Sequence, residues 1–70
     1  MQYGGYVKKK GKETRPEELA EMAREMANTV MNVEKEKPGC IVERAEFVIK
    51  EDTIGWKVAL LEPGETRKER

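Results

Sequence analysis

The first half of the chain carries a one-sided repeat of apolar residues. They recur at steps of three and four, at Leu19, Met22, Ala23, Met26, Val30 and Val33. Residues at these steps share one face of a helix, so the spacing predicts an amphipathic helix from about residue 15 to about residue 35. We expect Thr14 and Glu17 to form a capping box at its start, with Pro16 in the first turn. Pro38 and Gly39 should end it.

Three other segments have the composition or alternation of β-strands. Residues 3–9 contain aromatic and β-branched side chains, and residues 41–50 alternate between apolar and charged positions. From residue 54 to the Pro63–Gly64 turn, the apolar residues fall on alternate positions at Ile54, Trp56, Val58 and Leu60. Glu43 falls on the apolar face of its strand, which indicates a β-bulge or a strand that starts later. The last two strands should form an antiparallel hairpin.

These elements predict a small α+β domain in the order β-α-β-β. One amphipathic helix packs on a three-stranded sheet that is antiparallel or mixed, and parallel pairing of the first strand remains open. Seventy residues are too few for two independent cores, so we expect one domain over 1–70, with 65–70 as a frayed charged tail.

One helix can cover only one face of a sheet, and the predicted strands carry apolar residues on both faces. The surplus falls at Val42, Val48, Ala59 and Leu61. Exposed apolar surface of this kind is buried by self-association or by a protein partner. The sequence therefore predicts a homo-oligomer or a protein-binding module, with these four residues at the interface. The alternative is that they are scattered surface residues, which are common in monomers.

The residue types present limit the chemistry of the chain. It has no His, no Ser and one cysteine, Cys40. A His base, a Ser nucleophile, an intrachain disulfide and a thiolate zinc site are therefore excluded. We expect Cys40 to be a small, partly buried side chain, with a reactive thiol as the alternative. Glu43 should turn inward beside Arg44 or Arg24 as a structural ion pair, with a ligand contact as the alternative. We predict no catalysis, no cofactor and no metal.

Charged residues make up 40% of the chain, with 14 basic and 14 acidic side chains. A surface built almost wholly of Glu, Lys and Arg is typical of a heat-adapted protein or of a computationally designed one without evolved activity. Both origins stay open. The chain contains no apolar run long enough to span a membrane and no secretion signal at its start, so we expect a cytoplasmic protein.

The charges are unevenly distributed. Residues 8–15 carry a net charge of +4, and residues 16–37 a net charge of −3. A basic segment beside aromatic residues suits single-stranded nucleic acid, through Tyr3, Tyr6, Lys8, Lys9, Lys10 and Lys12. The competing interpretation is intramolecular, because these lysines can offset the carboxylates of Glu17, Glu21 and Glu25 along the helix.

Trp56 is the largest apolar side chain, and its place on the apolar face predicts a core residue. The chain length and the β-α-β-β order also resemble the dodecins, small flavin-storing proteins that assemble as twelve subunits. The resemblance implies a small-ligand carrier as a further alternative. Dodecins place a Trp early in the middle strand to stack on the flavin, whereas this region reads Cys40-Ile41-Val42-Glu43-Arg44 here. No flavin-binding residue is therefore carried over.

Overall fold

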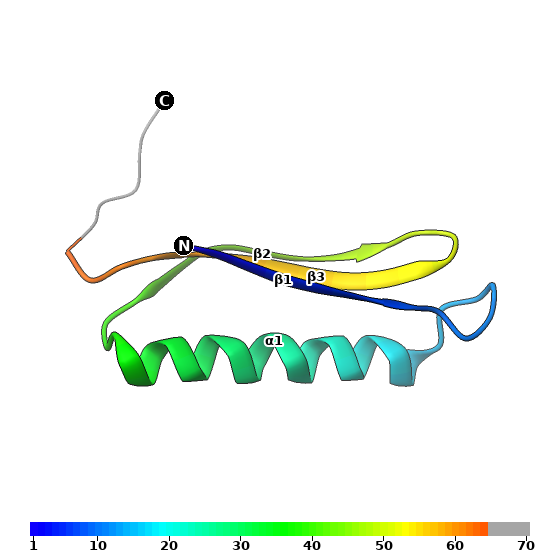
Figure 1. Ribbon diagram of the computed structural model, residues 1–70, viewed down its shortest axis with the longest axis horizontal. Coiled ribbons are helices and arrows are strands. Elements are labelled where there is room, and N and C mark those ends of the chain that lie inside the picture. The colour runs from blue at the N-terminus through cyan, green and yellow to red at the C-terminus, as the bar shows by residue number, and fades with distance from the viewer. Residues whose placement is uncertain (65–70) are drawn as a thin grey trace, which may run out of the picture.

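The computed structural model describes residues 1–64 and places one helix against one face of a three-stranded sheet (Figure 1). In chain order the elements are β1 (Gln2–Lys8), α1 (Pro16–Glu36), β2 (Ile41–Ile49) and β3 (Thr53–Leu61). The predicted α+β fold and its β-α-β-β order are confirmed. The tail predicted over 65–70 lies outside the described residues.

The sheet has the order β1-β3-β2, and both pairings are antiparallel. The last strand of the chain therefore lies in the centre, and the first two strands form the edges. The parallel pairing left open for β1 does not occur. Because β3 has neighbours on both sides and the helix packs mainly on it, β3 holds most of the core.

The core lies between α1 and the sheet. It consists of the buried side chains of Met22, Val33, Ile54, Trp56, Val58 and Leu60, and Met26, Val30 and Cys40 pack against it. The alternation of β3 is the one predicted, and Trp56 is a core residue as expected, with only 4% of its surface exposed. Leu19 and Ala23, which belong to the predicted apolar stripe of the helix, are exposed.

A β-bulge in β2 determines which side chains face the helix. Val42 pairs with Leu60 and Arg44 with Ala59, so Glu43 is an extra residue without a partner on β3. The predicted bulge is confirmed. The expected inward position of Glu43 is wrong, because its side chain is exposed. The bulge takes up the residue that would otherwise interrupt the apolar face.

The helix begins one residue later than the predicted capping box requires. Arg15 is the N-cap, in an extended conformation, and Pro16 occupies the first helical position. A residue that precedes proline is disfavoured in the helical conformation, which makes Arg15 rather than Thr14 the N-cap. The third helical residue is then Glu18, and its carboxylate accepts the Arg15 N–H at 2.8 Å. The predicted pair of Thr14 and Glu17 is replaced by Arg15 and Glu18.

Candidate interaction surface

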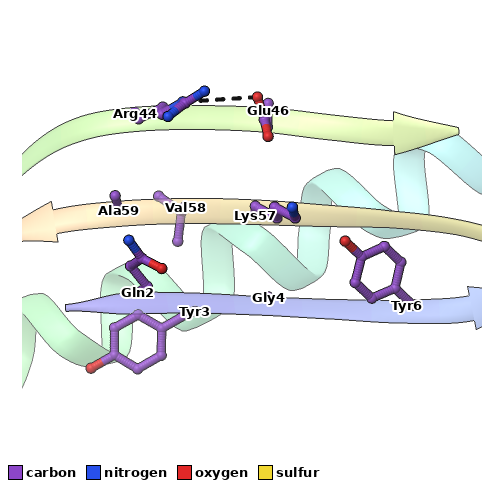
Figure 2. Close-up of a pocket in the computed structure, with 9 residues that line it drawn as sticks. All are labelled: Gln2, Tyr3, Gly4, Tyr6, Arg44, Glu46, Lys57, Val58 and Ala59. Carbon is purple, nitrogen blue, oxygen red and sulfur yellow. Dashed lines mark ion pairs between the residues drawn. The ribbon is translucent and has the colours of Figure 1, made fainter.

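The two faces of the sheet differ in what covers them. Directly paired residues of antiparallel strands point to the same side, so the register assigns every side chain to a face. The inner face, toward α1, contains the core residues of β3 and their partners Tyr3, Gly5, Ala45, Phe47 and Ile49. The outer face points away from the helix and contains Tyr6, Lys57 and Ala59, among others (Figure 2).

Trp56 shows how the helix sits across the sheet. Its Nε1 donates to the Glu25 carboxylate at 3.2 Å, and its indole lies over Gly5 of β1. Near the start of the helix, Glu18 accepts the Lys10 N–H at 3.3 Å, just beyond the end of β1. The flank of α1 that carries Glu18 and Glu25 therefore faces β1, and the opposite flank faces β2.

The flank toward β2 is apolar and so is the strand beside it. With about 100° per residue, Leu19, Ala23 and Val30 lie about 60–100° around the helix from buried Met22, on the side opposite Glu25. On β2, the inner-face side chains of Val42, Phe47 and Ile49 remain 48%, 42% and 54% exposed. We call these residues of the two elements the α1–β2 strip; its members are Leu19, Ala23, Val30, Val42, Ala45, Phe47 and Ile49.

The outer edge of β2 offers unpaired backbone groups next to the strip. The Lys50 N–H donates to the Thr53 carbonyl at 2.8 Å, and bonded pairs alternate along an antiparallel ladder. Arg44, Glu46 and Val48 therefore direct their backbone groups toward β3. Ala45 and Phe47 direct theirs away from the sheet, where another strand can pair with them.

The four predicted interface residues are not all on one face. Val48, Ala59 and Leu61 lie on the outer face and are partly buried. The position expected for Val42 is wrong: it lies on the inner face beside Leu60, because the Glu43 bulge shifts the alternation. The middle of the outer face contains Gln2, Arg44, Glu46 and Lys57. Exposed apolar side chains therefore lie on the α1–β2 strip and also toward the ends of the outer face, where Ile41 and Tyr6 are 54% and 48% exposed.

A shallow pocket on the outer face is lined by both aromatic and charged side chains. Tyr6 lies across Gly55, and Lys50 Nζ is 5.9 Å from the centre of its ring. Figure 2 shows Arg44 and Glu46 side by side on β2, with 3.9 Å between Nε and Oε1. The other lining residues are Gln2, Tyr3, Gly4, Lys57, Val58 and Ala59.

The residues predicted for nucleic-acid binding do not form one surface. Tyr3 belongs to the inner face, and its hydroxyl contacts Met1 Sδ, whereas Tyr6 is on the outer face. Lys9 Nζ donates to the carbonyls of Lys12 and Lys50 at 2.7 and 3.3 Å. The two tyrosine side chains therefore start from opposite faces of the sheet, and Lys9 is engaged within the molecule.

Two charged contacts hold the ends of α1. Hydrogen bonds from the Arg15 and Lys10 amides lower the pKa of Glu18 below its ordinary value of 4.5, helped by the charges of Lys9 and Lys10. At the other end, Lys37 Nζ donates to Glu62 Oε2 at 3.0 Å, and this hydrogen bond and charge raise the pKa of Lys37. Cys40, partly buried as expected, donates its thiol hydrogen to the Lys37 carbonyl at 3.1 Å.

Among residues 1–64, His, Cys, Asp and Glu side chains nowhere gather in groups of three that would hold a metal ion. Within the same residues, α1 is not long and apolar enough to cross a membrane. No family model, curated protein or solved structure matches this chain.

Proposed function

We propose that this chain is a non-catalytic assembly module that associates with copies of itself through the α1–β2 strip. The observation that carries the proposal is the exposure of Phe47, Ile49 and Val42 on the inner face of β2, together with that of Leu19 on the helix flank toward β2. Burying such side chains contributes about 25 cal/mol for each Å² removed from water, which favours an associated state.

The β1 edge of the sheet differs from the β2 edge, and this difference supports the α1–β2 strip as the contact surface. Beside β1 the helix presents Glu21, Glu25, Asn28 and Asn32. The strand itself contains Gly4 and Gly5, and Val7, 40% exposed, is an apolar side chain on its inner face. That edge ends at Lys8 and is followed by Lys9 and Lys10, and lysines disfavour pairing of an edge strand with another chain. The β2 edge combines open backbone groups with an apolar flank, which is the arrangement expected of a contact surface.

Replacement of Phe47 tests the proposal. In Phe47→Asp, a charge in the middle of the strip should weaken self-association by about tenfold or more, because that charge would have to be desolvated. Sedimentation equilibrium over micromolar to millimolar concentrations measures the effect. Tyr6→Asp is the matched control, since its ring has similar exposure but lies on the outer face, and its association should stay as in the wild type. A wild-type chain that remains monomeric throughout contradicts the proposal.

The outer face favours a second candidate function, the binding of single-stranded nucleic acid. Tyr6 exposes 48% of its surface and shares this face with Lys8, Arg44, Lys50 and Lys57. Bases stack on an exposed aromatic ring while cations attract the phosphates. This set replaces the predicted one, from which it keeps only Tyr6 and Lys8.

Fluorescence anisotropy with a labelled oligothymidylate at low salt tests the second candidate. Binding should weaken with rising salt and should fall in both Tyr6→Ala and Lys57→Glu. Lys12→Glu makes the same change of charge in the β1–α1 loop and is the control. Binding that survives in both outer-face variants, or that does not occur, removes this candidate.

A further inference from the structure

We infer that the second copy adds to the β2 edge in antiparallel fashion, about a two-fold axis at Ala45, and that Arg44 and Glu46 select this register. This inference rests on the proposed self-association and specifies how it occurs. The resulting dimer has one continuous sheet of the order β1-β3-β2-β2-β3-β1. An axis perpendicular to the sheet places both helices on the same side.

In this dimer the second copy would cover the α1–β2 strip of the first. Two central β3 strands would be separated by three strand spacings, about 14 Å. Packed helices usually lie 8–10 Å apart, so helices placed over the two β3 strands leave room between them for large side chains. Phe47 and Ile49 from both copies lie below this space, and Leu19 from both copies lines its sides. The strips of the two copies therefore bury one another.

The charges on β2 limit the register. Side chains of paired strands must point to the same face, so the axis must pass through a residue rather than between two residues. An axis at residue 44 sets Arg44 against itself, and an axis at residue 46 sets Glu46 against itself. An axis at residue 47 sets Arg44 against Lys50. Like charges directly opposite one another destabilise a strand pair, so these three registers are disfavoured.

Two registers bring opposite charges together. An axis at Ala45 sets each Arg44 against Glu46 of the second copy, and an axis at Val48 sets Glu46 against Lys50. Ala45 is the midpoint of β2, so in the first register the two strands overlap along their whole length. Regular pairing is then limited to residues 43–47, because beyond the bulge Val42 and the Val48 of the second copy point to opposite faces. The second slides the copies apart by six residues, about 20 Å, and leaves Val42 and Ala45 uncovered. The first register buries more of the strip.

The directions of the backbone N–H and C=O groups of β2 are compatible with the axis at Ala45. Ala45 and Phe47 direct their backbone groups away from β3, so the two Ala45 residues would exchange both hydrogen bonds across the axis. Phe47 would bond to the second copy at Glu43, the bulged residue. The bulge ends the regular pairing at both sides, and a closed two-fold contact leaves no free β2 edge for a third copy.

A charge exchange between two positions tests the inference. Arg44→Glu should weaken dimerisation by about tenfold or more, because two pairs of carboxylates then face each other. The double variant Arg44→Glu/Glu46→Arg should restore it, because the opposite charges meet again. With the axis at Val48, the arginine introduced by Glu46→Arg would face Lys50, and the double variant would not be restored. Lys12→Glu reverses a charge in the β1–α1 loop, away from β2, and should dimerise as the wild type.

Cross-linking provides a second readout in a Cys40→Ala background. Facing Ala45 residues would be about 5.5 Å apart at Cα, within the range for a disulfide. Ala45→Cys should therefore form a covalent dimer of twice the 8.1 kDa chain mass on mild oxidation, and Val48→Cys should not. The register is overturned if Val48→Cys cross-links in preference to Ala45→Cys. It is also overturned if the double variant Arg44→Glu/Glu46→Arg fails to restore dimerisation while the wild type still associates. Either result leaves the proposed self-association standing. A wild-type chain that is monomeric in sedimentation overturns both.

Discussion

At the scale of single residues, two glycines let aromatic rings lie on opposite faces of the β1–β3 pair. Gly5 faces Trp56 on the inner face, and Gly55 faces Tyr6 on the outer face. A Cβ at Gly55 would meet both the Gly5 carbonyl oxygen and the Tyr6 ring. Backbone cannot move aside as a flexible side chain can, so this position has no room for a larger residue.

Gly55→Ala should destabilise the protein by about 1–3 kcal/mol, the usual effect of overpacking. Urea denaturation followed by Trp56 fluorescence measures it. Gly11→Ala is the matched control, because a Cβ there meets no atom within 4 Å, and its unfolding free energy should change little. Equal stability of the two variants would show that the sheet accommodates the extra methyl group.

The pKa of Glu18 predicts a pH dependence at the start of the helix. A carboxyl whose pKa is lowered by folding stabilises the protein above its ordinary pKa of 4.5, and this stabilisation is lost as the pH falls through the folded pKa. The difference in unfolding free energy between the wild type and Glu18→Gln should thus be largest above about pH 6 and shrink toward pH 3. Thr14→Ala, which precedes the N-cap, should keep the wild-type pH dependence. If the unfolding free energies of the wild type and Glu18→Gln differ by the same amount at every pH, the assignment of this pH dependence to Glu18 is contradicted.

At the scale of elements, periodicity was enough to predict the helix and all three strands to within one or two residues. It was not enough to predict which flank of the helix stays bare, because that depends on the strand order. Leu19 and Ala23 have the spacing of core residues, but they face the edge strand β2 and not β3. The sequence did contain a signal against the predicted capping box of Thr14 and Glu17, because Pro16 disfavours a helical conformation at Arg15.

The bulge at Glu43 makes a prediction about deletions in β2. Glu43 is exposed and has no partner on β3, so its deletion leaves the pairing of every other β2 residue unchanged. We expect stability within about 1 kcal/mol of the wild type. Deletion of Val48 should be strongly destabilising, because it turns Phe47 outward and brings Arg44 and Glu46 to the inner face. Urea denaturation of both variants tests this, and equal loss of stability would contradict the register.

At the scale of the whole molecule, one helix is too narrow to cover the inner face of three strands. The helix packs mainly on β3, and the inner-face side chains of β2 stay exposed, with the open strand edge beside them. The proposed dimer resolves both features with one contact. The surplus of apolar residues was predictable from the sequence, but its location was not, because the bulge and the strand order together decide the face.

Residue-resolved amide hydrogen exchange at two protein concentrations tests the central claim most directly. At a concentration where the chain associates, the amides of Ala45 and Phe47 should exchange more slowly than in dilute solution, because they gain hydrogen bonds to the second copy. The amides of Glu46 and Val48 already bond to β3 and should change much less. Exchange at Ala45 and Phe47 that is independent of concentration, or protection gained along β1 instead, would contradict association through the β2 edge.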